Sequence, residues 1–167
     1  MKVALLLCAM SVPAWAQGGG PTAACGSFGV DYKVNLNQPQ PVETPDAGKA
    51  RVYFIHDAGT FTAHPLAYPT TKMAMDGAWV GANHGDSAFS LSVDPGEHHL
   101  CAMLQSSFVS NRVELAHFAA EAGKTYFFRT RLLLSRDVEL LELLPIDSDE
   151  GAYLVGSFEV SVSHPKK

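Results

Sequence analysis

Apolar and polar residues alternate in short runs along most of the chain, and glycine, proline, asparagine or aspartate stands between the runs. Alternation with a period of two is typical of β-strands that bury one face. Runs of this kind cover residues 28–36, 50–56, 71–75, 78–81, 87–93, 98–105, 112–120, 124–133 and 138–144. Short strands at this spacing predict an all-β fold, mainly an antiparallel β-sandwich of the immunoglobulin type.

A helical period does not persist within this body, but one short helix is predicted near the C-terminus. Asp147 fits the N-cap position, and Glu150 stands three residues later, as in a capping box. The acidic residues 147–150 could also be read as a calcium loop. They lack the further oxygen ligands and the closing glutamate of such a loop, so the cap is the preferred interpretation.

The first sixteen residues have the layout of a secretory signal peptide. Lys2 precedes the apolar run 3–12, and Ala14 and Ala16 are the small residues before a cleavage site. The run is too short to span a bilayer, so no transmembrane segment is expected after cleavage. We therefore expect a periplasmic or secreted protein that begins at Gln17. Neither Cys8 nor Cys25 stands in a lipobox directly after the apolar run, so lipid attachment is not expected.

The pattern divides the chain into three parts. Residues 1–16 form the signal peptide, and residues 17–49 form an N-terminal arm and proline-rich linker that includes one strand. Residues 50–167 form the β-sandwich domain with its C-terminal helix and tail. Lys2 is the only charged residue within residues 1–16, so their removal changes the formal net charge from −5 to −6. With no basic cluster beyond the terminal lysines, nucleic acid is not an expected partner.

Two cysteines, Cys25 and Cys101, remain after cleavage. An even pair in an oxidising compartment predicts one disulfide, which would join the arm to the domain. Two inert thiols or a metal-binding pair are the alternatives.

Two adjacent histidines follow a Pro-Gly turn in the segment VDPGEHHLCAML, residues 93–104. If residues 94–97 form a hairpin turn, Val93 lies opposite His98, and side chains then alternate between the two faces. His98 and His99 point to opposite faces, so they cannot share a metal ion unless a bulge intervenes. His99 and Cys101 share a face but need a third ligand. The remaining histidines lack metal-binding spacing, so no metal or cofactor is expected.

Other candidate binding residues are scattered. Arg129 and Arg131 could bind an anionic ligand, but a solvated sheet face is the preferred interpretation. Trp79 could stack on a carbohydrate or could belong to the core or its rim. His84 lies in the predicted turn 83–86, which, like the turn at Asp76 and Gly77, could contact a partner. No nucleophile elbow, P-loop or dinucleotide-binding glycine pattern occurs.

The segments MAMDGAWVG and SAFSLSVDPGEHHL, followed by EAGKTYFFR, resemble the bacterial family called domain of unknown function (DUF) 2846. Their turns are also similar to those of the PEGA-type β-sandwich repeat. The resemblance covers about residues 48–144. It implies a β-sandwich in secreted or lipid-anchored envelope proteins, and it supplies no catalytic residue.

We therefore expect an exported, non-enzymatic module of the cell envelope that binds another protein or a surface polymer. The alternative is a small-ligand or metal-binding periplasmic protein that uses His99 and Cys101. A hydrolase has no positive support, because serine, histidine and aspartate occur in no spacing that suggests a triad.

Overall fold

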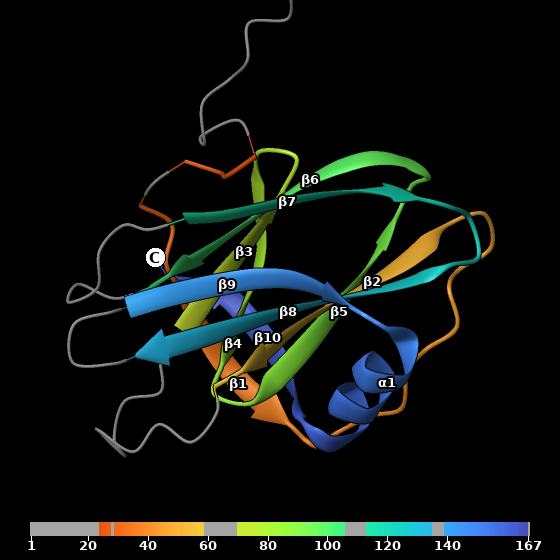
Figure 1. The fold of residues 1–167 in the computed structure, drawn as a ribbon. Helices are drawn as coiled ribbons and strands as arrows, with labels where there is room; N and C mark the ends of the chain where they lie inside the picture. Colours follow the sequence, from red (N-terminus) through yellow and green to blue (C-terminus); the bar gives the residue numbers. More distant parts are fainter. Residues whose placement is uncertain (1–23, 28, 59–69, 106–112, 135–138, 167) are drawn as a thin grey trace, which may run out of the picture.

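The computed structural model describes residues 24–27, 29–58, 70–105, 113–134 and 139–166, which form two β-sheets stacked face to face (Figure 1). In spatial order, the larger sheet contains β1 (Tyr32–Asn37), β10 (Glu159–Pro165), β5 (Ser87–Val93), β2 (Ala50–Asp57), β8 (Thr125–Leu134) and β9 (Glu139–Ile146). The smaller sheet contains β4 (Ala78–His84), β3 (Thr70–Met75), β6 (Gly96–Leu104) and β7 (Val113–Ala120). The predicted all-β sandwich is confirmed.

The sheets are mainly antiparallel, but two pairs of neighbouring strands run parallel. These are β2 with β8 and β5 with β10. The expected signal peptide, its cleavage site after Ala16 and the leader up to residue 23 lie outside the described residues. Within the described part of the chain, no helix is long and apolar enough to cross a membrane.

The main core lies between the two sheets and follows from the alternation seen in the sequence. Each strand turns every second side chain inward. The larger sheet contributes Val52, Phe54 and Phe128, and the smaller sheet contributes Met73 and Leu100, all nearly without solvent exposure. A Cβ on Gly81 would meet the ring of Phe89, so a larger residue at this position on β4 would force that ring to shift.

The predicted hairpin across residues 94–97 is wrong. β5 belongs to the larger sheet, whereas β6 pairs with β3 and β7 in the smaller one, so the Pro-Gly turn carries the chain from one sheet to the other. Val93 and His98 are therefore not cross-strand partners. The predicted division of side chains between two faces is nevertheless correct. Both strands turn their apolar sides to the shared interior, where Leu91, Val93 and Leu100 belong to the same core.

Two shorter sequence signals are confirmed. Asp76 and Gly77 have φ angles of 52° and 81°, which suit the tight hairpin turn between β3 and β4. Asp147 caps α1 (Ser148–Ser157), because its Oδ1 accepts hydrogen bonds of 2.9 Å from the backbone N–H groups of Asp149 and Glu150.

The helix α1 covers the outer face of the larger sheet (Figure 1). Val155 packs there against Tyr53, Ile55 and Phe127. The close approach depends on Gly151, since a Cβ at this position would lie 2.6 Å from Cδ1 of Phe127.

Replacing Gly151 with alanine is expected to lower the free energy of unfolding by about 1–3 kcal/mol, because the added methyl group must push α1 from Phe127. Gly156→Ala is the matched control, since a Cβ at this position would meet no neighbouring atom and alanine favours a helix by roughly 0.5–1 kcal/mol. Urea denaturation of both variants measures the difference. Equal stability of the two variants would contradict this account of the packing.

The outer face of the smaller sheet is partly covered by the N-terminal arm. Cys25 and Cys101 form the predicted disulfide, with their Cα atoms 5.1 Å apart. Ala74, Trp79 and Val113 pack around it. The arm continues into β1, which pairs with β10 at the edge of the larger sheet, so the predicted strand at residues 28–36 is observed at residues 32–37.

Candidate functional site

Five buried polar side chains gather at one end of the space between the sheets. They come from five strands and are almost without exposure: His56, Thr71, Asn83, Ser87 and Thr130. The strand period explains their position, because three of them stand two residues from inward-facing Phe54, Met73 and Phe128. No local motif in the sequence marked this group.

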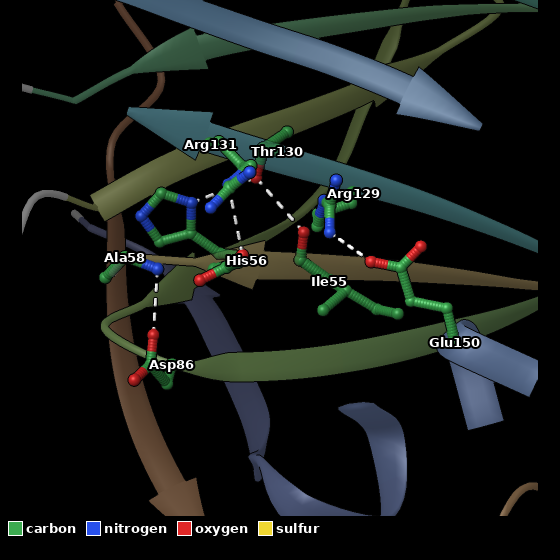
Figure 2. Close-up of polar contacts among 9 residues, drawn as sticks. Ile55, His56, Ala58, Asp86, Arg129, Thr130, Arg131 and Glu150 are labelled. Carbon is green, nitrogen blue, oxygen red and sulfur yellow. Dashed lines mark hydrogen bonds and ion pairs between the residues drawn. The ribbon is translucent and has the colours of Figure 1, made fainter. Parts of the chain in front are cut away.

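Within the polar cluster, His56 lies beside Thr130 (Figure 2). Its Nδ1 lies 3.0 Å from Oγ1 of Thr130 and 3.4 Å from Oγ1 of Thr71. The Thr130 hydroxyl donates to the carbonyl of Ile55, so it accepts from Nδ1–H of His56. Nε2 is then the unprotonated nitrogen, and it has no hydrogen-bond partner among the described residues.

Burial lowers the pKa of His56 to about 4, although the nearby charge of Asp57 and the contact with Thr130 oppose the shift. The imidazole is therefore neutral at pH 7. Its environment suits a structural histidine in the core rather than a base near pH 7.

Ser87 is the register partner of His56 across β2 and β5, but the two side chains are not hydrogen bonded. The Ser87 hydroxyl donates to Oδ1 of Asn83 at 3.4 Å and accepts from the backbone N–H of His84. Asn83 in turn donates to the carbonyl of Phe54 at 3.0 Å. Within the described residues, this cluster lacks the bond between nucleophile and base that would activate a serine.

Arg129 and Arg131 lie on the opposite face of β8 from Thr130, and each meets a carboxylate (Figure 2). Arg129 pairs with Glu150 of α1, and Nε of Arg131 lies 3.1 Å from Oδ2 of Asp57. An anionic ligand would have to displace these carboxylates. The arginines therefore hold α1 and the end of β2 in place, where Asp86 also accepts a hydrogen bond of 2.8 Å from the backbone of Ala58.

Trp79 is engaged by the N-terminal arm. Its Nε1 donates to the carbonyl of Ser27 at 2.8 Å, and Gly26 packs against the same edge of the ring. The ammonium group of Lys72 lies 4.6 Å from the ring centroid. These contacts occupy one face and one edge of the indole and hold it against the arm.

The chain turns at Gly85 and Asp86, within the expected turn at residues 83–86, but the turn is shorter than expected. β4 extends through His84, so the side chain of Asn83 is buried and cannot reach a partner. His84 is half-buried, and its Nδ1 lies 3.1 Å from Oγ1 of Thr70. Both residues lie at the end of the sandwich that holds the buried polar side chains, and not in an exposed loop.

His98 joins two turns. Its Nε2–H donates to the carbonyl of Asp94 at 2.8 Å, and its Nδ1 lies 2.7 Å from Oδ2 of Asp76. Burial alone would lower the pKa of His98, but these two acceptors outweigh it and raise the pKa. Burial would likewise raise the pKa of Asp76, which the backbone N–H of His99 and the imidazole of His98 instead lower. The hydrogen-bonded pair therefore clamps the two turns together.

His99 lies on the other face of β6, as the sequence pattern predicted, and it is exposed. It does not form a site with Cys101, whose sulfur is bonded to Cys25 and is not a free thiolate. The residue directly opposite His99 is His117 of β7, and the two ring centroids are 6.4 Å apart. The sequence offered no signal for this pairing, since it depends on which strand lies beside β6.

A small hollow lies beside α1 on the outer face of the larger sheet. It has a volume of about 80 Å³ and is lined mainly by Pro41, Tyr53, Val155 and Val160. The hydroxyl of Tyr53 accepts a hydrogen bond of 2.7 Å from the backbone of Glu43 at its rim. Pockets for drug-sized ligands have volumes of roughly 300–1,000 Å³, so this hollow suits only a few atoms.

Comparisons with protein-family models, with curated proteins and with solved structures found no match for this chain. Its function is therefore inferred from the arrangement of its own residues.

Proposed function

We propose that this protein is an exported, non-enzymatic module of the cell envelope that binds an extended segment of another protein at the outer edge of β7. The disulfide supports export, because such bonds form and persist in oxidising compartments. The polar groups described above are mostly engaged with one another, which favours a binding surface over a reaction centre.

The observation that carries the proposal is a difference among the four edge strands. The side chains of Ser161 and Ser163 on β10 bond the backbone of Ala82, so they occupy the edge of β4. β1 carries Lys33, and β9 carries Glu142 and Pro145. Charges and proline are the usual protection of an exposed edge.

β7 is less protected, because it carries neither lysine nor proline. Its sequence, VELAHFAA, contains one charged residue and no proline, and Leu115 is 49% exposed. Among the described residues, no strand pairs with the outer edge of β7. Such an edge can add a strand from a partner, whose backbone would pair with β7 and whose alternate side chains would meet Leu115 and Ala119.

A photoreactive amino acid at Leu115 is expected to crosslink one discrete envelope protein in the producing cells. Leu144, on the β9 edge, is the matched control, because it is 47% exposed but adjoins Pro145. Adducts are measured by immunoblot and mass spectrometry. Equal labelling from both positions, or no protein adduct from Leu115, would refute binding at β7, and a polydisperse carbohydrate adduct would favour a surface polymer.

A blocking variant makes the test more specific. With the photoreactive residue at Ala119, Leu115→Lys is expected to abolish the adduct, because a lysine on an edge strand disfavours pairing with a further strand. Leu144→Lys should leave it intact. Both lysines replace exposed leucines, so circular dichroism should show unchanged folding.

A further inference from the structure

We infer that His99 and His117 form a two-histidine site for a divalent first-row transition-metal ion on the outer face of the smaller sheet. This inference does not depend on the proposed binding at β7. The two residues are directly opposite in the antiparallel pairing of β6 and β7, and both are exposed. Within the described residues, neither imidazole forms a side-chain hydrogen bond or ion pair.

The geometry suits a chelate. Directly opposite residues in an antiparallel pair have Cβ atoms roughly 4.5–5.5 Å apart, so both side chains rise from the sheet side by side. The ring centroids are 6.4 Å apart, and the ring planes are inclined by 32°. Metal–nitrogen bonds of roughly 2.0–2.1 Å require the rings to approach somewhat more closely. Rotation about the side-chain bonds supplies this approach, because no side-chain bond to another described residue holds either exposed ring.

The rigid base of the site comes from the disulfide. Cys101 stands two residues after His99 on the same face, and its bond to Cys25 anchors the centre of β6. Val113, on the same face of β7 as His117, packs against this disulfide. The backbones that carry the two histidines are therefore fixed relative to each other, which lowers the entropic cost of closing a chelate.

The chemistry of the donors defines the class of ion. Neutral imidazole suits copper, nickel and zinc, and affinity for such sites rises from cobalt through nickel to copper(II). Glu97 stands two residues before His99 on the same face and adds negative charge there. Two protein ligands leave further coordination positions for water or for a group from a bound partner. His98 cannot contribute, because it points to the other face and binds Asp76 and Asp94.

The test is calorimetric titration of the exported protein with nickel(II) chloride at pH 7.5, in a buffer that does not coordinate metals. We expect one ion per chain, and we expect either His99→Gln or His117→Gln to weaken binding by roughly tenfold or more, since each removes the intramolecular second ligand. His164→Gln is the matched control. It also removes an exposed strand histidine, but its register partner is Lys33 rather than a histidine.

A second readout locates the ion. Substoichiometric nickel(II) should selectively broaden the imidazole proton signals of His99 and His117 in NMR spectra, while those of His164 remain sharp. Unchanged affinity in both glutamine variants would overturn the assignment. So would absence of binding at millimolar nickel, or equal broadening of all exposed histidines. Because both side chains are exposed, the variants should unfold at the temperature of the metal-free wild type.

Discussion

Replacing both Cys25 and Cys101 with alanine is expected to lower the free energy of unfolding by about 4 kcal/mol. The disulfide joins residues 76 positions apart, and a crosslink that closes so long a loop restricts the unfolded chain strongly. The bond also holds the arm over Ala74 and Trp79, so its loss exposes apolar surface in the folded protein. Guanidinium denaturation of the wild type and the double variant, both in oxidising buffer, measures the effect.

Local release of the arm can be separated from global destabilisation. After removal of residues 1–16, Trp79 is the only tryptophan, and it is bonded to Ser27 in the arm. In the double variant we expect its fluorescence to shift to longer wavelength before the far-ultraviolet circular dichroism changes. Reductant should destabilise the wild type to the level of the variant and leave the variant itself unchanged. Coincident denaturation curves for wild type and variant would rule out a stabilising role.

The second large effect is a dependence of stability on pH that arises from His56. Its pKa in the folded protein is about 4, below the ordinary value of 6.5. Between these values the unfolded chain binds the proton and the folded protein does not. Stability is therefore complete above about pH 6.5 and falls as the pH drops towards 4, with a total loss of about 3 kcal/mol.

The matched experiment compares unfolding free energies of the wild type and His56→Leu at pH 7.5 and pH 4. Carboxylates titrate in both proteins, so the difference between the two pH dependences isolates His56. We expect the wild type to lose about 3 kcal/mol more than the variant over this range. His98→Gln is the second control. The raised pKa of His98 gives stability that is lost as the pH rises, so its removal cannot reproduce the effect of His56. Parallel pH dependences in wild type and His56→Leu would refute the buried neutral state.

Strand order decided which candidate residues meet. Residue alternation correctly placed His99 and Cys101 on one face and His98 on the other. It could not show that His117 lies opposite His99, because that contact depends on the neighbouring strand β7. The assumed hairpin at residues 94–97 failed for the same reason, since a short turn suits both a hairpin and a crossing between sheets.

The carboxylate partners of the two arginines also depend on the tertiary structure. Their spacing placed Arg129 and Arg131 on one face of a strand, and that face exists. The sequence could not reveal that Glu150 and Asp57 neutralise them, because these carboxylates come from α1 and the end of β2. Likewise, the strand period places His56 on the same face as Phe54, but its polar surroundings could not be predicted, since four other strands build them.

The sequence pattern did not predict β10, because residues 159–165 were expected to form a tail after the helix. The sequence by itself determined the other strands and their buried faces, the tight turn at Asp76 and Gly77, the cap at Asp147 and the pairing of Cys25 with Cys101. These features depend on side-chain period, local backbone conformation or a count of thiols, all of which are encoded within a few residues or in the composition. Only the tertiary structure decided the order of the strands, the burial of His56 and the meeting of His99 with His117. Those depend on how two apolar sheet faces cover each other, which is a property of the whole chain.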